Sequence, residues 1–381
     1  MKLQKSHEDK KKVLIAYGSI GLGHKVVAEN IAAALVKYPG VEVKVLDLLE
    51  MYQGSLVKVF SKFYKWMIDR VPWLWGFIYT NIFFQIITLP LRIPFAGLKI
   101  KKFRDYVNRE KPDLILTCHP NATGLVAYLK KTGQYAGPLV TTFSDFHFQP
   151  YWVYQYVDQY LVMTAEQKRE VARLGFAEDK IAVIGLPVNP IFQKEFDEGE
   201  IIKKFGLSRA KPLVLVMGGS QGWGIRLSDI AELLQTKYDI QIIVVTGKNA
   251  ELKQAIDNLA KTAATPLQAF VSWSAEDIAK LFSAAKILVT KPGGLTIAQA
   301  LLKSLPMVLV NPLPTMEEMN LDYLTSHGAG VYAKSSEEVR TWVERLLADK
   351  KYYAETRERE RAIASPQAAE TAAKIIIDML K

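Results

Sequence analysis

The chain has 381 residues, of which 49% are hydrophobic and 23% are charged, and this balance is typical of a globular protein rather than a disordered one. Its single cysteine, Cys118, excludes an intramolecular disulfide and any zinc or iron–sulfur site built from several cysteines. The length favours two domains, and the cysteine count fits a reducing cytoplasm. The basic start of the chain leads directly into a strand-like run, so we expect no signal peptide.

The net charge of +10 is concentrated in one segment, Lys58 to Arg104, which holds nine Lys or Arg residues, one Asp and twelve aromatic residues. Basic charge interleaved with aromatic rings indicates an anionic membrane surface as partner, with nucleic acid as the competing interpretation and a buried helical hairpin as the structural one. Prolines and polar residues interrupt its apolar part, which favours two interfacial helices over a spanning helix. The candidate membrane contacts are Lys62, Lys65, Trp66, Trp73, Trp75, Phe83 and Phe84.

The first predicted strand, Val13 to Tyr17, is followed by a glycine loop, Gly18 to His24, and a helix, Val26 to Lys37. Gly21 and Gly23 belong to a G-x-x-G-x-G spacing, whereas the dinucleotide-binding fingerprint is G-x-G-x-x-G. Asp47 ends the next strand, where a ribose-binding acid would stand. The mismatched spacing nevertheless disfavours a nicotinamide-dependent enzyme.

Four further short strands follow the aromatic segment and alternate with helical or loop segments, which predicts a parallel sheet. Polar residues follow two of these strands directly: His119 comes after one, and Asp145 and His147 come after the next. Ligands of open α/β sheets bind at such carboxyl ends. The four predicted strands are Leu114 to Thr117, Leu139 to Phe143, Tyr160 to Met163 and Ile181 to Ile184.

A proline-rich break, Gly185 to Pro190, and a polar stretch, Gln193 to Lys211, are interpreted as a domain linker. A second series of strands and helices then begins, and its first strand ends in another glycine loop, Gly218 to Gly222. The architecture therefore repeats, and we expect two domains, residues 1–187 and 188–381. The last helix is expected either to stay with the second domain or to pack back on the first. The predicted strands of this half are Leu213 to Met217, Ile240 to Val245, Ala269 to Val271, Ile287 to Val289 and Met307 to Val310.

The stretch Val289 to Asn320 contains a glycine turn, Pro292-Gly293-Gly294, between a strand and a helix. Unpaired N–H groups and the helix dipole make such a turn suited to an anion such as a diphosphate. No cluster of carboxylates in the sequence resembles a magnesium site, so we expect no metal.

These motifs together resemble the family 28 glycosyltransferases of the GT-B fold, and within them the monogalactosyldiacylglycerol synthases and processive diacylglycerol glucosyltransferases. The resemblance rests on an ordered set of segments from about Val13 to Lys350 and implies two Rossmann-like, doubly wound domains facing a cleft, with an aromatic basic helical insertion in the first. The segments are Gly18 to His24, Pro72 to Trp75, His119-Pro120, Asp145 with Trp152, Val157-Asp158, Gly185 to Val188, Gly247 to Asn249, Phe270-Val271 and Lys291 to Gly294.

The sequence departs from the family pattern at three positions. Gln299 stands where the family has a ribose-binding Glu, Met316 replaces a glutamine that reaches sugar hydroxyls, and Gln149 stands where a His is usual. An amide can still bond a ribose hydroxyl, but without the charge-assisted strength of a carboxylate. The thioether of Met316 is only a weak acceptor.

The resemblance implies inverting transfer of glucose or galactose from a UDP-sugar to diacylglycerol at the cytoplasmic face of the cell membrane, by a peripheral enzyme. Asp145 and His24 are the candidate general bases, and the residues alone do not separate them. Asp145 could instead be the N-cap of a helix, and His24 could instead bind a substrate hydroxyl or phosphate through the glycine loop. Gly21, Gly23, His119 and His147 are expected on the acceptor side. The expected donor-binding residues are Gly219, Ser220, Gln221, Lys248, Asn249, Phe270, Val271, Pro292, Gly293, Gly294, Leu295, Thr296, Gln299, Met316, Glu317 and Asn320.

Two alternatives stay open at this point. The same fold could serve a polyprenyl-linked acceptor or a nucleotide-sugar epimerase, although an epimerase has no need of the aromatic basic segment. The departures at Gln299, Met316 and Gln149 also fit a catalytically weakened protein that binds a nucleotide sugar or a lipid.

Overall fold

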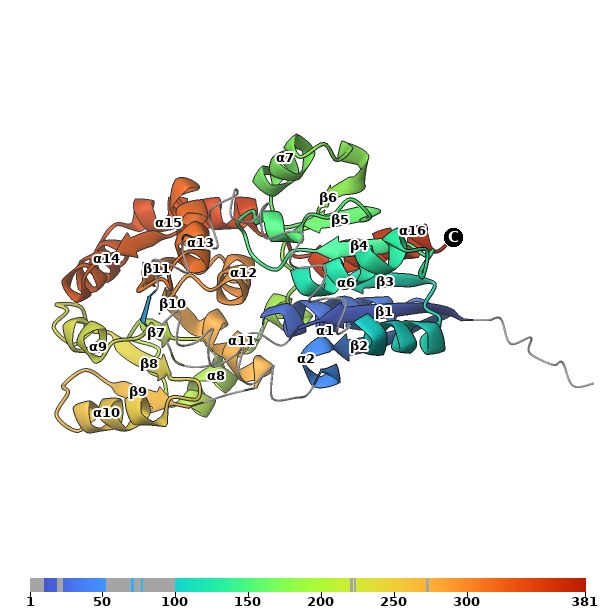
Figure 1. Cartoon of the computed structure of the whole chain (residues 1–381). Helices are drawn as coiled ribbons and strands as arrows, with labels where there is room; N and C mark the ends of the chain where they lie inside the picture. The colour runs from blue at the N-terminus through green and yellow to red at the C-terminus, as the bar shows by residue number, and fades with distance from the viewer. Residues whose placement is uncertain are drawn as a thin grey trace, which may run out of the picture. The chain divides into compact units, whose positions relative to one another are not determined.

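A computed structural model describes residues 10–18, 23–52, 70–71, 77, 100–219, 222, 224–271 and 274–381 (Figure 1). The chain divides into two compact units. Unit 1 is Met1–Val188 with Gln367–Lys381, and unit 2 is Asn189–Pro366. The aromatic basic segment expected to contact a membrane lies almost wholly outside the described residues. No helix in the described ranges is long and apolar enough to cross a bilayer.

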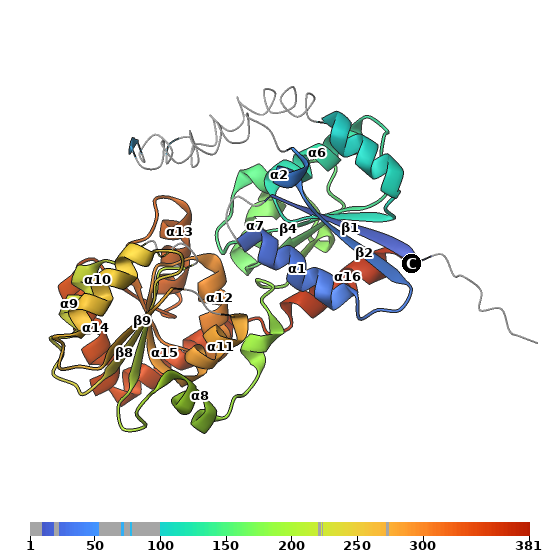
Figure 2. The same cartoon turned by 90° about the horizontal axis from the view of Figure 1, so that it is seen from below.

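Unit 1 is built on a six-stranded parallel sheet with the order β2-β1-β3-β4-β5-β6. Helix α1 and the carboxy-terminal helix α16 pack side by side on one face, and α6 lies on the other (Figure 2). The elements are β1 (Lys11–Tyr17), α1 (Gly23–Leu35), β2 (Val41–Asp47), α2 (Leu48–Met51), β3 (Leu114–Thr117), α6 (Pro120–Lys131), β4 (Leu139–Thr142), η1 (Pro150–Trp152), β5 (Gln159–Val162), α7 (Ala165–Arg173), η2 (Glu178–Lys180), β6 (Ile181–Val183) and α16 (Ala368–Met379).

Unit 2 holds a second six-stranded parallel sheet with the order β12-β11-β10-β7-β8-β9. Helices α9, α10 and α14 lie on one side of it, and α11 and α12 on the other (Figure 2). The elements are η3 (Pro190–Gln193), α8 (Glu198–Phe205), β7 (Leu213–Met217), α9 (Leu227–Leu233), β8 (Gln241–Val245), α10 (Ala250–Ala260), β9 (Leu267–Phe270), α11 (Ala275–Ala284), β10 (Ala285–Thr290), α12 (Gly294–Lys303), β11 (Met307–Val310), α13 (Met316–Ser326), β12 (Val331–Ala333), α14 (Ser336–Ala348) and α15 (Lys350–Ile363).

The central strands of both sheets are buried on both faces, which explains their continuous apolar sequences. All five residues of β7 and all four of β3 are buried. In each sheet the strand order reverses direction once: between β1 and β3 in unit 1, and between β7 and β10 in unit 2. The loops after the two flanking strands diverge at such a switch point, and the crevice that this creates is where open α/β sheets bind ligands.

Two local features differ from the sequence-based expectations. The polar stretch interpreted as a linker contains α8, because Asp197 caps its start, Gly206 ends it in the left-handed conformation, and Ile201 and Phe205 bury its apolar side. Strand β12 was not predicted, because three residues are too few for a periodic pattern.

Glu360 on α15 is a buried acid without hydrogen-bonded support. Its side chain is fully buried, and neither carboxyl oxygen has a hydrogen-bond partner among the described residues. Burial raises the pKa of this carboxyl well above its usual value, although the Arg357 guanidinium opposes that shift. The raised pKa adds stability to the folded protein that is complete below pH ~4.5 and is lost as the pH rises through the folded pKa.

We therefore expect Glu360→Gln to raise the melting temperature relative to wild type, and to raise it more at pH 8 than at pH 5, because an amide carries no charge that must be buried. Differential scanning fluorimetry across this pH range measures the difference. Glu358→Gln on the same helix is the control, since the side chain of Glu358 is 75% exposed. An equal gain at both pH values for Glu360→Gln would contradict the account.

Candidate functional site

The switch point of unit 1 brings together residues from the ends of three strands. His24 lies in the first turn of α1, which follows the loop after β1, His119 follows β3, and Ser144 and Asp145 follow β4. The rings of His24 and His119 meet edge to face at 4.7 Å between centroids. These contacts bring side chains that follow three neighbouring strands together at the carboxyl edge of the sheet.

His24 is held by a hydrogen bond and an aromatic contact. Its Nδ1 lies 2.9 Å from the Ser144 hydroxyl oxygen, and its ring lies 5.9 Å from that of Trp152. Burial lowers the pKa of the imidazole, while the Asp145 carboxylate and a hydrogen bond to the Cys118 backbone act in the opposite direction. The ring is therefore neutral at neutral pH and able to accept a proton, and Asp145 would stabilise the imidazolium once formed.

His119 contacts His24 and also has a structural role. It is the N-cap of α6, and its Nδ1 accepts a hydrogen bond from the Asn121 amide at 3.1 Å. Burial, followed by the neighbouring His24, lowers the pKa of His119 well below its usual value. A Cβ atom at Gly18 would lie 3.3 Å from the His119 ring, so the backbone at Gly18 approaches this histidine closely.

The other expected residues of this side are placed as follows. Gly23 is the first residue of α1, His147 is buried, and Gln149 caps η1 through its side-chain oxygen. Asp145 caps no helix of the described chain, so the interpretation of Asp145 as an N-cap is wrong. Asp47 does cap a helix, since its Oδ1 accepts from the Leu49 amide at 2.9 Å. Gly21 lies outside the described residues.

The switch point of unit 2 is lined by two glycine turns. Gly219, Gly222 and Gly224 follow β7 and have φ angles of +69°, +70° and +81°, in the left-handed region that favours glycine. A Cβ at Gly222 would lie 2.0 Å from the Thr246 carbonyl oxygen, so no other residue fits there. Ser220 and Gln221, expected to bind phosphate, lie outside the described residues.

The second turn follows β10 and opens α12. Gly293 is the N-cap of α12 and has no side chain to bond the first-turn amides, so the amides of Gly294, Leu295 and Thr296 are left for another acceptor. Thr290 fixes the turn from below, because its hydroxyl donates to the Met217 carbonyl at 2.8 Å and thereby joins the ends of β10 and β7. The helix dipole adds about half a positive charge at this point.

Two residues of α13 hold the same turn from the side. Asn320 is fully buried and donates to the Pro292 carbonyl at 3.1 Å. Glu317 forms an ion pair with Lys291 and accepts a second hydrogen bond from the Leu313 amide at 2.8 Å. Both oxygens of Glu317 are thus engaged within the protein, so this acid supports the turn instead of presenting a free carboxylate to a sugar.

The remaining residues of the predicted donor site lie around this switch point or on the neighbouring strands. Gln299 is partly buried in the second turn of α12, and Met316 is partly buried at the start of α13. Asn249 caps α10 by accepting from the Leu252 amide at 2.9 Å, while its neighbour Lys248 is exposed. Phe270 ends β9, and its carbonyl accepts from the Thr246 amide at 2.8 Å; Val271 is 40% exposed.

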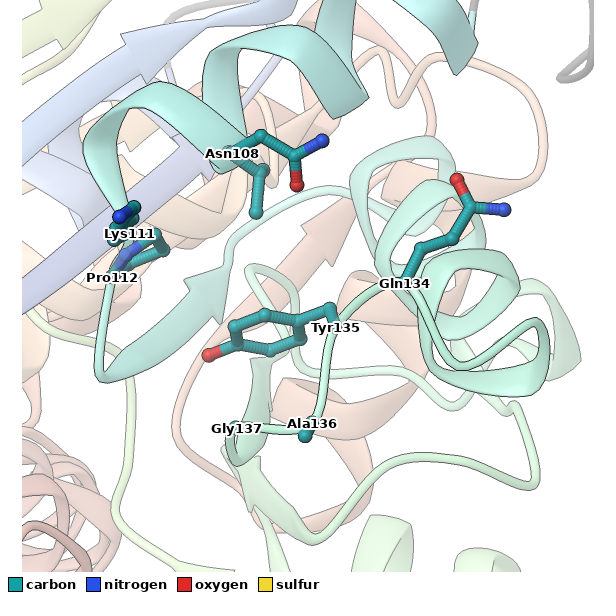
Figure 3. Close-up of a pocket in the computed structure, with 8 residues that line it drawn as sticks. Asn108, Lys111, Pro112, Gln134, Tyr135, Ala136 and Gly137 are labelled. Atoms are coloured by element: carbon teal, nitrogen blue, oxygen red, sulfur yellow. The ribbon is translucent and has the colours of Figure 1, made fainter.

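A cavity of about 490 Å³ lies elsewhere, at the amino ends of β3 and β4 (Figure 3). Lys111, Gln134 and Tyr135 line it. Because parallel strands all point the same way, this cavity is at the edge of the sheet opposite the histidine cluster. No group of three or more metal-ligating side chains occurs within the described ranges.

Comparisons with known proteins identify the family of this chain. The family described as Monogalactosyldiacylglycerol (MGDG) synthase matches residues 24–188, and the Glycosyltransferase family 28 C-terminal domain matches residues 213–377. The two matches together cover most of the chain, which therefore belongs to the family 28 glycosyltransferases. It is a glycosyltransferase of the group that includes the monogalactosyldiacylglycerol synthases and the diacylglycerol glucosyltransferases.

Full-length relatives support the same group. The chain is 27% identical over 380 residues to a processive diacylglycerol beta-glucosyltransferase of Bacillus pumilus, covering 97% of this chain and 95% of the relative. It is 28% identical over 350 residues to the enzyme of that name from Bacillus subtilis, with 89% and 87% covered. Among solved structures, MurG of Acinetobacter baumannii aligns with a TM-score of 0.64 and 17% identity over 97% of this chain and 99% of that one, which shows the GT-B fold.

We expect Lys291→Met to lower the free energy of unfolding by about 3 kcal/mol, because it leaves the Glu317 carboxylate buried without its cation. The double variant Lys291→Met with Glu317→Gln should recover at least half of that loss. Urea unfolding followed by circular dichroism measures both. Lys253→Met, which breaks a half-exposed pair with Asp257 on α10, is the control and should cost less than about 1 kcal/mol. A loss for Lys291→Met no larger than the control would contradict this role of the ion pair.

Proposed function

We propose that the protein transfers glucose or galactose from a UDP-sugar to the hydroxyl group of diacylglycerol, with inversion, giving a β-glycosyl diacylglycerol. Unit 1 would bind the lipid and unit 2 the donor. The observation that carries the proposal is the position of the histidine cluster and of the glycine turns at the two switch points, within a chain whose full-length relatives are named processive diacylglycerol beta-glucosyltransferases.

On the donor side, the amides at the start of α12 and the positive end of its dipole would hold the diphosphate and stabilise the charge that develops as UDP departs. The loop with Gly219 and Gly222 would supply further amides. Gln299 would bond the ribose through its amide. Each well-placed donor of this kind contributes about 3 kcal/mol to transition-state stabilisation, so the leaving group can be stabilised by the protein itself.

On the acceptor side, a base must take the proton of the lipid hydroxyl as its oxygen attacks the anomeric carbon and the bond from that carbon to the diphosphate breaks. In the proposed step the two residues act as a pair: the neutral imidazole accepts the proton, and the Asp145 carboxylate, which raises the pKa of this ring, stabilises the resulting imidazolium. The hydroxyl of Ser144 fixes the ring through Nδ1.

Membrane attachment through residues 58–104 is part of the proposal. It is supported by the charge and aromatic content of that segment in the sequence. The enzyme would then act as a peripheral protein on the cytoplasmic face of the cell membrane.

A second candidate, a nucleotide-sugar-binding protein with weakened catalysis, is favoured by one observation. Glu317 is paired with Lys291, and Met316 offers no strong hydrogen bond, so the α13 side of the donor site has few groups for sugar hydroxyls.

Incubation with UDP-glucose or UDP-galactose and diacylglycerol vesicles should release UDP, and faster from vesicles with anionic lipid than from neutral ones, because basic side chains are attracted to the anionic surface. A coupled UDP assay with lipid chromatography of the product measures both. Tight UDP binding without turnover of either donor would favour the binding protein, and equal rates on the two kinds of vesicle would contradict membrane attachment through charge.

His24→Ala and Asp145→Asn should each lower kcat about a hundredfold. If Asp145 acts through His24, the double variant should be no more than about threefold slower than His24→Ala, because residues that act as a unit are not additive. Steady-state rates at saturating donor decide this.

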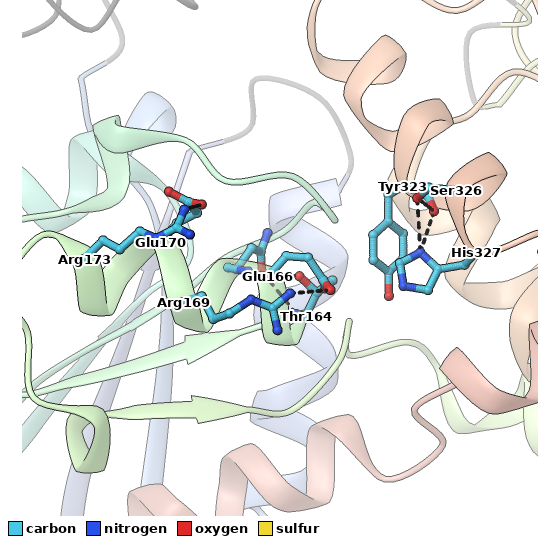
Figure 4. Close-up of polar contacts among 9 residues, drawn as sticks. Thr164, Glu166, Arg169, Glu170, Arg173, Tyr323, Ser326 and His327 are labelled. Atoms are coloured by element: carbon cyan, nitrogen blue, oxygen red, sulfur yellow. Dashed lines mark hydrogen bonds and ion pairs between the residues drawn. The ribbon is translucent and has the colours of Figure 1, made fainter.

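His327→Ala is the matched control for the loss of a histidine. His327 follows the last residue of α13, and its Nδ1 lies 2.8 Å from the Tyr323 carbonyl oxygen in the last turn of that helix (Figure 4). Its removal should leave kcat within about twofold of wild type. A fully additive loss in the His24 and Asp145 double variant would show that the two residues act independently.

A further inference from the structure

Gln167 is a buried polar residue that the proposed reaction does not use. It is the third residue of α7, and its side chain is fully buried. With Thr164 it forms a capping box: the Thr164 hydroxyl oxygen accepts from the Gln167 amide at 3.2 Å, and Oε1 of Gln167 accepts from the Thr164 amide at 3.3 Å. Figure 4 shows this end of α7, with exposed ion pairs along its outer side.

The other half of the Gln167 side chain reaches a different element. Its Nε2 donates to the carbonyl oxygens of Asp145 and His147, each at 2.7 Å. Its Oε1 also accepts from the Met163 amide at 2.6 Å. The amide group therefore joins the end of β5 and the start of α7 to the loop that follows β4.

That loop, residues 143–149, forms neither helix nor strand, yet most of it is buried. Buried carbonyl groups outside regular structure need partners from side chains or water. Gln167 supplies partners to two of them, on both sides of Phe146. Gln167 thus bonds, from its buried side, the loop that carries Ser144 and Asp145 to His24.

A capping box alone does not explain a glutamine at this position. The cap needs only an acceptor oxygen, which a glutamate would supply equally well. The donation from Nε2 to two carbonyl groups of the loop requires the amide nitrogen.

We propose that Gln167 is a positioning residue, which holds the loop of residues 143–149 so that Ser144 and Asp145 are set against His24 for proton transfer. The proposal rests on the proposed function, since it assigns these residues to the acceptor side of the reaction. Gln167 contacts neither substrate in this account and acts through the loop alone. Misplacement of a reacting group by about 1 Å can cost a hundredfold in rate, so fixing this loop matters for turnover.

Two variants separate the loop contacts from the cap. Gln167→Met removes all hydrogen bonds of the side chain at similar volume. Gln167→Glu keeps the acceptor for the amides of Met163 and Thr164 but has no N–H group, so it can donate to at most one of the two loop carbonyls, and only when protonated. If the first variant fails to fold, the second still tests the proposal, because its helix cap is intact.

Gln241→Met is the matched control. Gln241 is also buried. It is the first residue of β8, and its side chain bonds a loop of unit 2. Its Oε1 accepts from the Ser208 amide at 2.9 Å, and its Nε2 donates to the carbonyls of Ser208 and Lys211 at 2.8 and 2.6 Å. It lies at the amino end of its strand, away from the switch-point loops, which follow the carboxyl ends.

Hydrogen–deuterium exchange of the full-length variants and steady-state kinetics with UDP-glucose and diacylglycerol vesicles provide the test. Both Gln167 variants should exchange about tenfold faster in residues 143–149 and lose about tenfold or more in kcat, with the KM for the donor within about twofold of wild type. Gln241→Met should change neither the exchange of this loop nor kcat.

Unchanged loop exchange in both Gln167 variants would overturn the positioning role, and so would kcat values equal to that of Gln241→Met. If the wild type transfers no sugar to any acceptor, the proposed function fails, and the exchange rates alone then decide. Faster exchange confined to residues 143–149 would support the role of Gln167 in holding the loop, and unchanged exchange would refute it.

Discussion

Both candidate sites depend on the loops that diverge where the strand order of a parallel sheet reverses. In unit 2, Gly293 opens α12 without a capping side chain, so the first-turn amides and the helix dipole point at whatever fills the crevice. The surrounding contacts keep this turn in place: Thr290 bonds the end of β7, Asn320 bonds the carbonyl of Pro292, and Lys291 is paired with Glu317.

Unit 1 uses the same topology for different chemistry. Its switch point brings two histidines into edge-to-face contact, and burial lowers the pKa of both rings. They differ in what holds them. His119 uses Nδ1 to cap α6, so protonating that nitrogen would cost the cap, whereas His24 has an acid nearby that favours its charged form. This asymmetry makes His24 the better proton acceptor of the two.

The strands and the glycine turns of both units could be predicted from the sequence. The side-chain pairings could not, for physical reasons. Each predicted strand of the two sheets lies within two residues of an observed one at either end, because buried parallel strands have continuous apolar sequences. The glycine turns could also be predicted, because glycines stand between the end of a strand pattern and the start of a helix pattern. Nothing in the spacing of Glu317 shows that Lys291 and the Leu313 amide take both of its oxygens. The T-x-x-Q pattern at Thr164 to Gln167 predicts a capping box. The contacts of Gln167 with the loop could not be predicted, because the bonded residues are 20 and 22 positions away in the chain.

The central claim is that the turn at the start of α12 holds the diphosphate of the donor. A crystal structure with UDP bound tests it most directly. The β-phosphate oxygens should lie within hydrogen-bond distance of the amides of Gly294 and Leu295, with the ribose beside Gln299. UDP bound away from the switch point of unit 2, or phosphates held only by surface lysines, would contradict it.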